Sequence, residues 1–449
     1  MKSILWRGLI AGFVLPLVGV SAAVAETVAP TLPVATESKT TSAAGVDPVV
    51  RTEFAARAER ELRGNILPFW LRYAPDPTGG GFYGTVKDDL TVVKSAPRGS
   101  LLTSRILWAF SAAYRRYHDP MYLDMARRAY DELLKRFWDD QNGGLYWTIS
   151  ADGKPHDASK QIYDQVFGIY ALSEYHRATA DPMALERAIA LYRVVEKYGH
   201  DPVNGGYYEV FTRDWRRDRP GKSPVNTIST KSQNTHLHVM EAYANLLRVW
   251  PDAGLKANQR ALLELMLTRI YDAKTHHLRL FMNDDWTPHS EAFSYGHDIE
   301  AAWLMTEAAN VLGDSEIIAH ARRVAVEIAE TTLKEGIDRD GGVCNEGGPS
   351  GVTDRTKAWW PQAEAVVGFL EAYQISGDKR FFDTALRSWN YIDQHFVDHA
   401  RGEWFESVSR DGVARRQPKI SLWKCPYHNS RSCHEIIDRM AALSAEPQH

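Results

Sequence analysis

The sequence is poor in the features that mark several large classes of protein. It has only three cysteines among 449 residues, which excludes a scaffold built on disulfides. Its 53 Lys and Arg are balanced by 57 Asp and Glu. The net charge of −4 excludes nucleic acid as the main partner, because no basic excess is present to neutralise phosphates. Beyond the N-terminus no apolar run approaches the length of a membrane span, so we expect no membrane contact in the mature chain.

The N-terminus has the pattern of a secretory signal. Lys2 and Arg7 precede an apolar stretch over residues 8–20, and Ala23-Val24-Ala25 supplies a cleavage pattern of small residues. A membrane anchor is the alternative, although the apolar stretch is short and contains Pro16. We predict a signal peptide over residues 1–25, a flexible linker over residues 26–46 and a secreted or periplasmic mature protein.

Export to an oxidising compartment raises the question of disulfides. Cys425 and Cys433 could pair, which would leave Cys344 alone. An odd number of cysteines favours the other interpretation, in which all three are small buried thiols.

A short signature recurs at intervals of roughly sixty residues. Each copy begins with Asp, continues through Gly or Gly-Gly, and ends on aromatic or β-branched residues, as expected for a tight turn followed by a short strand. The copies begin at Asp76, Asp140, Asp201, Asp338 and Asp398, with a weaker one at Asp272. These are six copies of one unit.

Helical patterns fill the intervals between the turns. Apolar residues at i, i+3, i+4 and i+7 predict helices within residues 105–114, 121–137, 163–178, 182–198, 236–250, 259–271, 299–312, 317–333, 363–375 and 379–396. Turn signals at Asp119, Asp181, Gly313 and Gly377 separate paired helices. Six helical hairpins could stack as an open solenoid. The count favours an all-α closed double ring, an (α/α)6 barrel, over residues 47–449, with a deep pocket inside the inner ring.

Two helix starts carry polar residues that core packing does not explain. Asn234 and His238 are four residues apart and share a helix face, so they are either pocket residues or a helix cap with a satisfied inner histidine. His297 and Glu300 also share a face, and Glu300 could raise the basicity of the histidine and orient it. The alternative is a helix cap with a structural ion pair. No His-Glu-x-x-His motif is present, and a metal site is disfavoured.

Aromatic residues mark two further segments. Trp423 and His428 stand on either side of Pro426, and the proline favours an irregular loop here. Polar and aromatic residues on such a loop suggest a functional position. The alternative is a plain surface loop. Trp359 and Trp360 stand at a helix entrance, and we expect one indole in the core and the other in the pocket. The whole chain has 14 Trp and 20 Tyr. Many will be core residues, but their flat faces also suit sugar rings.

These segments together resemble the N-acylglucosamine 2-epimerase superfamily, and within it the cellobiose 2-epimerase branch. The resemblance rests on the stretches beginning at Arg105, Asn234, Gly296, Trp359 and Trp423, and it spans roughly residues 50–438. It implies an (α/α)6 barrel and an isomerase acting on a sugar substrate. It implies that His297 and His428 are the acid/base groups, that Arg105, Asn234, His238 and Glu300 contact the sugar or the histidines, and that Trp360 and Trp423 stack on the sugar.

The implied reaction inverts C2 of the reducing-end glucose of a β-1,4-linked disaccharide through a cis-enediolate. It needs no metal, nicotinamide or ATP, and the sequence contains no Walker pattern. The superfamily also includes aldose–ketose isomerases that act on free mannose. Two other classes stay open: a glycoside hydrolase, which would need two carboxylates, and a sugar-binding protein, which would not need two histidines.

Overall fold

The computed structural model describes residues 46–218, 222–223, 226 and 228–445, all within one compact unit. The predicted signal peptide and nearly all of the predicted linker lie outside the described residues. Among the described residues, no helix is both long and apolar enough to cross a membrane. Cys344, Cys425 and Cys433 are free and buried, as the preferred interpretation of the cysteines predicted.

Two sets of helices alternate along the chain. The first set is α3 (Ser100–Tyr117), α5 (Ile162–Thr179), α7 (Gln233–Leu247), α9 (Tyr295–Leu312), α11 (Trp359–Ser376) and α13 (Tyr427–Ala445). The second set is α1 (Pro48–Glu61), α4 (Pro120–Glu132), α6 (Pro182–Val194), α8 (Ala253–Leu265), α10 (Ser315–Glu335) and α12 (Lys379–Tyr391). α2 (Leu67–Tyr73) follows α1, and π-helical turns end five of the outer helices: Leu62–Ile66, Leu133–Phe137, Val195–Gly199, Met266–Ile270 and Ile392–Phe396.

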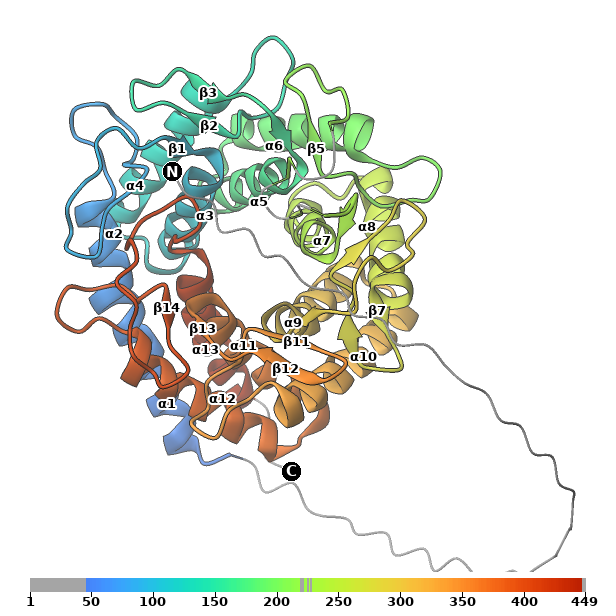
Figure 1. Cartoon of the computed structure of the whole chain (residues 1–449). Helices are drawn as coiled ribbons and strands as arrows, with labels where there is room; N and C mark the ends of the chain where they lie inside the picture. The colour runs from blue at the N-terminus through green and yellow to red at the C-terminus, as the bar shows by residue number, and fades with distance from the viewer. Residues whose placement is uncertain (1–45, 219–221, 224–225, 227, 446–449) are drawn as a thin grey trace, which may run out of the picture. The chain divides into compact units, whose positions relative to one another are not determined.

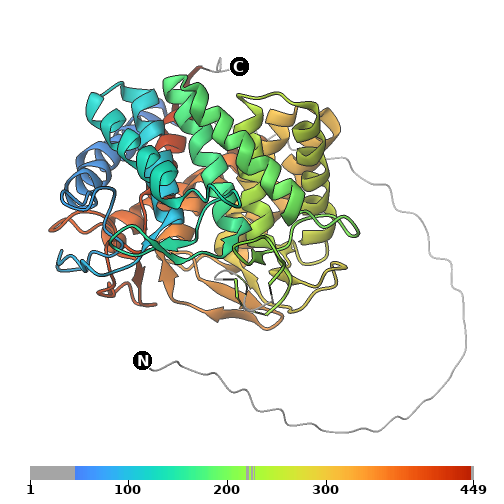
Figure 2. The same cartoon turned by 90° about the horizontal axis from the view of Figure 1, so that it is seen from above.

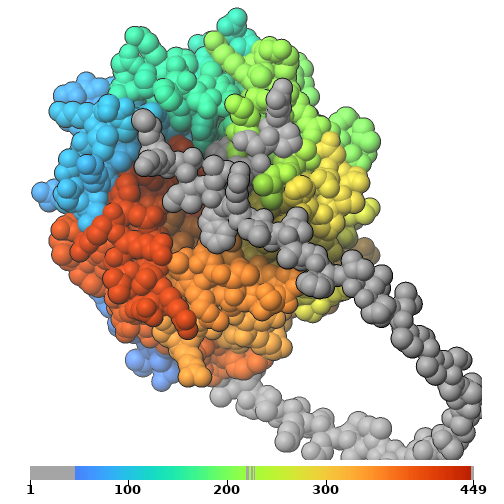
Figure 3. Space-filling view, in the orientation of Figure 1, coloured from blue at the N-terminus to red at the C-terminus, as the bar shows by residue number. Residues whose placement is uncertain are grey.

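The first set forms an inner ring and the second set covers it (Figure 1). The ring closes because α13 packs against α3, α11 and α1, which brings the N-terminal and C-terminal segments side by side (Figure 3). The predicted (α/α)6 barrel is confirmed. The sixth helix pair differs from the others, because it joins α13 at the C-terminal end of the described chain to α1 at its N-terminal end.

Short strands gather at one end of the helices (Figure 2). Most pairings join the strand before an inner helix to the strand of the following turn, so each repeat is tied to the next. The strands are β1 (Arg98–Gly99), β2 (Thr148–Ile149), β3 (Pro155–Asp157), β4 (Lys160–Gln161), β5 (Val210–Phe211), β6 (Lys231–Ser232), β7 (Tyr271–Asp272), β8 (His277–Leu278), β9 (Phe281–Met282), β10 (Phe293–Ser294), β11 (Glu346–Gly348), β12 (Gly351–Asp354), β13 (Lys357–Ala358) and β14 (Ser407–Val408).

Local sequence explains where the outer helices begin. Asp119 and Asp181 cap α4 and α6 through hydrogen bonds to Met121 N and Met183 N, each with Pro at the first helical position. Such a cap is worth about 1 kcal/mol. α9 and α11 end at Gly313 and Gly377, whose positive φ of 75° and 71° suits glycine. The predicted helix-to-helix turns are therefore confirmed.

The recurring turns are held against the starts of the inner helices. Gln165 Oε1 accepts from Leu145 N at 2.7 Å, and His236 Nε2 accepts from Tyr207 N at 2.8 Å. Gly206 precedes Tyr207 with φ of 74°, and a Cβ there would lie 2.6 Å from His236 Nε2. These contacts require glycine at the turn and hold the first turns of α5 and α7.

In several copies the acidic residue of the turn also pairs with a buried cation. Asp201 meets Lys231 Nζ at 2.7 Å and Asp139 meets Lys160 Nζ at 3.1 Å. In the second copy the sequence pattern suggested Asp140, but the turn begins at Asp139, whose Oδ1 accepts from the backbone of Gln141.

Candidate active site

A cavity of about 270 Å³ lies among the starts of the inner helices, at the end where the strands gather. Every inner helix supplies at least one side chain to its wall, so residues far apart in sequence meet there. The lining residues are Arg105, Tyr163, Asn234, His238, His297, Glu300, Trp359, Trp360, Trp423 and His428.

All eight residues singled out in the sequence line this one cavity. The structure brings them together, and their roles stay predictions. Tyr163 and Trp359 line it as well, so both adjacent indoles, and not only one, face the cavity. Tyr163 stands in the first turn of α5, the same place in its repeat as Asn234 in α7, and that register could have identified it.

His428 is buried, and a glutamate forms a hydrogen bond with its ring on the side away from the cavity. Its Nδ1 lies 2.7 Å from Glu364 Oε1, which leaves Nε2 free toward the cavity. Burial, together with the charges of Arg105 and Arg431, lowers the pKa of His428 well below its usual range. A neutral ring donating from Nδ1 to a carboxylate presents a basic Nε2. The predicted irregular loop is wrong at this residue, because α13 begins at Tyr427, directly after Pro426, and places His428 in its first turn.

His297 lies in the first turn of α9, and its ring centroid is 4.5 Å from that of Trp360. The ring of His428 approaches the same indole, with centroids 5.8 Å apart. Burial, with a smaller contribution from His238, lowers the pKa of His297 to about 3. Nδ1 of His297 has no partner among the described residues. The predicted pairing of His297 with Glu300 is wrong, because Glu300 turns instead to Arg431.

Arg431 joins the carboxylates behind the cavity and was not identified from the sequence. Its Nη2 donates to Glu300 Oε1 at 2.9 Å and to Glu364 Oε1 at 2.7 Å, and its Nη1 pairs with Glu241. Glu241 in turn accepts from His238 Nδ1 at 2.8 Å. A single guanidinium therefore positions the carboxylates that orient two cavity histidines. Arg431 stands three residues after His428, and that helical spacing was the available signal.

Arg105 is buried and lacks an acidic partner among the described residues. Its Nη2 donates to Tyr163 Oη at 2.9 Å, and its guanidinium lies 4.2 Å from the ring centre of Phe167. Nε of Arg105 and Oδ1 of Asn234 are both buried without a partner. A buried cation without an acidic partner gives the cavity wall an affinity for negative charge, whereas the unsatisfied amide oxygen of Asn234 can accept a hydrogen bond from a substrate hydroxyl.

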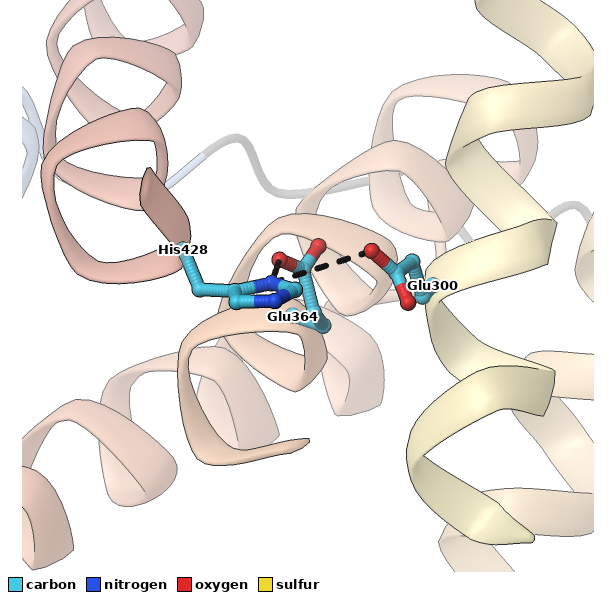
Figure 4. Close-up of side chains that lie close together, drawn as sticks. All are labelled: Glu300, Glu364 and His428. Carbon is cyan, nitrogen blue, oxygen red and sulfur yellow. Dashed lines mark hydrogen bonds and ion pairs between the residues drawn. The ribbon is translucent and has the colours of Figure 1, made fainter. Parts of the chain in front are cut away.

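Glu300, Glu364 and His428 each offer a ligand atom, and these atoms lie within 4.8 Å of one another (Figure 4). That spacing would suit a metal ion. However, Arg431 already places a cationic Nη2 against both carboxylates, and Nδ1 of His428 is already hydrogen-bonded to Glu364. The donor set is therefore better explained as a cluster organised by the guanidinium.

Comparisons with known proteins show the family and the fold of the chain. Residues 81–430 match the family model of N-acylglucosamine 2-epimerase (GlcNAc 2-epimerase). A cellobiose 2-epimerase of Bacteroides fragilis is 41% identical over 382 residues, which cover 84% of this chain and 97% of the relative. The solved cellobiose 2-epimerase from Bacillus thermoamylovorans B4167 superposes with a TM-score of 0.82 and 39% identity, over 86% of this chain and 100% of that chain.

A solved D-mannose isomerase matches with a TM-score of 0.76 at 21% identity, over 86% of this chain and 98% of that chain, a likeness of fold alone. The barrel, its site and these relatives define a carbohydrate epimerase, which is an isomerase. The chain belongs to the N-acylglucosamine 2-epimerase family.

Proposed function

We propose that the enzyme inverts C2 of the reducing-end glucose of a β-1,4-linked disaccharide, converting cellobiose to glucosyl-mannose and acting in the same way on mannobiose or lactose. The observation that carries this proposal is the pair His297 and His428. They come from different inner helices, they line the same cavity, and both rings lie against Trp360.

Two bases on separate walls suit the chemistry of this inversion. C2 of an open-chain aldose lies beside the C1 carbonyl, so one base can remove its proton and give a cis-enediolate. A proton delivered to the opposite face of C2 then yields the epimer. A neutral histidine can take a proton as a base and return it from the imidazolium, and the bond to Glu364 stabilises the charge that His428 acquires.

The oxyanion of the enediolate also needs stabilisation. Arg105 is suited to this, because it lines the cavity as a buried cation with no carboxylate partner among the described residues. Asn234 adds an amide in the first turn of α7. Donors of this kind act more strongly in a site that excludes water.

The aromatic wall supports a sugar larger than one ring. Trp360 lies beside both histidines, and the ring of Trp423 stands 6.0 Å from Trp147 and 6.1 Å from Tyr163. Two lining indoles of this kind can stack on successive sugar units. The names of the relatives point to cellobiose as the first substrate to try.

An aldose–ketose isomerase acting on mannose or a related free sugar is the second candidate. The same two histidines would serve it, because the enediolate gives a ketose when C1, rather than C2, receives the proton. A glycoside hydrolase is less well supported, since Glu300 is the one carboxylate among the lining residues.

The decisive experiment incubates the enzyme with cellobiose, mannobiose, lactose and mannose in deuterated water. Proton NMR then follows deuterium entry at C2 and the identity of each product. We expect C2-deuterated epimer from a disaccharide, with no rise in reducing ends. A ketose from mannose as the dominant product would favour the second candidate, and neither exchange nor product would contradict both.

We also propose that the enzyme works outside the cytoplasm on sugars released from polymers there. The Lys2 and Arg7 start, the apolar stretch and Ala23-Val24-Ala25 support this. N-terminal sequencing of exported protein should begin at Glu26. An exported protein that begins at Met1 would contradict cleavage.

A further inference from the structure

The carboxylates behind the cavity differ in how many donors they receive. Glu241 accepts from Arg431, Tyr427 and His238, and Glu364 accepts from Arg431, His428 and Trp303. Among the described residues Glu300 accepts a hydrogen bond from Arg431 alone, through Oε1 at 2.9 Å, and the same oxygen lies 3.8 Å from His428 Nδ1. Its other oxygen, Oε2, is buried and has no partner among the described residues.

The charges of this buried cluster do not balance if all the acids are ionised. Glu241, Glu300 and Glu364 would carry three negative charges against the single guanidinium of Arg431. Arg105, on another wall, adds one more positive charge, while burial keeps His238 and His428 toward the neutral form. One negative charge remains unmatched where isolated charges are costly, so one acid should hold a proton.

Donor count identifies which acid that is. Glu241 and Glu364 each accept three hydrogen bonds, which stabilise their carboxylate forms. Glu300 accepts one, and its Oε2 has no partner among the described residues, so Oε2 can carry a proton. Burial, followed by the charge of Glu364, raises the pKa of Glu300 well above its usual range. A carboxylic acid kept neutral in this way becomes a hydrogen-bond donor.

We propose that Glu300 is a neutral carboxylic acid in the working enzyme, and that it donates a hydrogen bond from Oε2 to the substrate oxygen that gains negative charge. Glu300 lines the cavity on α9, whereas Arg105 lines it on α3, so the oxyanion would be held from two walls. An ionised Glu300 at the same place would repel the enediolate. The identity of this substrate oxygen rests on the proposed epimerisation, but the protonation of Glu300 does not.

Infrared spectroscopy tests the proton directly. The difference spectrum of wild type minus Glu300→Gln at neutral pH should show the loss of one protonated-carboxyl C=O band, which shifts in deuterated water. Other buried acids such as Asp164 cancel in this difference. The matched variant Glu371→Gln, whose acid pairs with Thr306 and Arg439 away from the cavity, should keep the band. A difference spectrum without the band, or a band that Glu371→Gln removes as well, would overturn the proposal.

Stability gives a second readout that needs no turnover. Gln replaces a neutral acid without changing charge, so Glu300→Gln should melt within a few degrees of wild type. Glu364→Gln removes a carboxylate from Arg431 and His428 and should melt distinctly lower. A Glu300→Gln variant that unfolds as readily as Glu364→Gln, or does not fold, would contradict a neutral Glu300.

Kinetics then tests the donation to substrate. Glu300→Gln keeps an N–H donor and should retain activity within about 10-fold of wild type, whereas Glu300→Ala should lose about 10²-fold or more. Equal losses in the two variants would overturn the role as donor. If the wild type inverts no sugar, the proposed function fails, while the infrared and melting results still decide whether Glu300 holds its proton.

Discussion

His428 Nδ1 in the first turn of α13 lies 2.7 Å from Glu364 Oε1 on α11. This bond joins the last inner helix of the chain to its neighbour. It also selects the ring tautomer that carries its proton on Nδ1, which leaves a basic Nε2 toward the cavity. Because Arg431 and Trp303 hold the same carboxylate, Glu364 is fixed before substrate binds. Glu364 does not line the cavity, so it is a positioning residue for His428.

Replacing Glu364 by Gln should therefore affect turnover more than binding. The amide can donate toward Nδ1 and force the other tautomer, so we expect kcat to fall about 10²-fold or more while KM changes little. Glu371→Gln is a matched control on the same helix, since Glu371 accepts from Thr306 and Arg439 away from the cavity. Steady-state kinetics on the two variants checks this. A loss confined to KM would contradict a positioning role.

Replacing Arg105 should lower the activity of the enzyme much more than its stability. This arginine has no hydrogen-bonded acidic partner among the described residues, so Arg105→Met strands no directly paired acid and should change the melting temperature little. Loss of oxyanion stabilisation should lower kcat/KM by about 10²-fold or more.

The control for Arg105 is a paired buried arginine. Arg98 meets Asp76 at 2.5 Å and Glu132 at 3.1 Å, so Arg98→Met strands two buried acids and should cost about 3–5 kcal/mol of unfolding free energy. Denaturant titrations of both variants check the contrast. Arg105→Met destabilised as strongly as Arg98→Met would indicate that Arg105 is structural.

Much of the fold could be predicted because short local sequence signals mark each repeat. The Asp-Gly turns, the Asp119 and Asp181 caps and the glycine stops lie within a few residues of what they organise, so six periods indicated a barrel. Asn234, His238, His297 and Glu300 were identified as polar residues at helix starts, whereas the family resemblance alone implied Arg105. Tyr163 was missed because a tyrosine in a sequence with 20 of them carries no distinctive signal.

The helix α13 was missed for a different reason. Apolar periodicity does not detect a helix whose first turns are mostly polar, and the buried first turns of α13 include His428, Asn429 and Arg431. Their partners, Glu364, Glu403 and Glu241, come from elsewhere in the chain. Only the tertiary structure brings these charges together, so the spacing of His428 and Arg431 could suggest a shared helix face but not the role of Arg431.

Single histidine variants should separate proton exchange from inversion. His297→Ala and His428→Ala should each lower epimerisation roughly 10²-fold or more, the usual effect of losing a general acid or base. The remaining base can still exchange the C2 proton of one epimer with solvent. Deuterium entry and epimer formation, followed separately from each epimer, check this. His399→Ala, at an exposed site, is the control. Folded variants that both epimerise at near wild-type rates would contradict the assignment.

Chelation should leave the enzyme fully active. Glu300, Glu364 and His428 are close enough to hold an ion, but Arg431 already supplies positive charge to both carboxylates. We expect unchanged kcat/KM after exhaustive dialysis against a chelator. Activity that is lost and returns only with a divalent ion would contradict the cofactor-free mechanism.

Stability should depend on pH through His277, which lies on β8 outside the cavity. Its Nδ1 is 2.7 Å from Asp298 Oδ2 and its Nε2 is 3.3 Å from Glu335 Oε2, with the Phe293 ring stacked at 3.5 Å. Burial alone would lower the pKa of His277, but the hydrogen bond and charge of Asp298, with the charge of Glu335, outweigh it and raise the pKa above its usual value.

A raised folded pKa means that the folded state binds the proton more tightly than the unfolded state. The stabilisation from His277 is then fully present below the unfolded pKa of about 6.5 and is lost as pH rises through the higher folded value. The difference in unfolding free energy between wild type and His277→Asn should therefore shrink as pH rises above about 6.5. Denaturant titrations across that range check it, with the exposed His399→Asn as control. A difference that stays constant or grows with pH would show that His277 is not held protonated between Asp298 and Glu335.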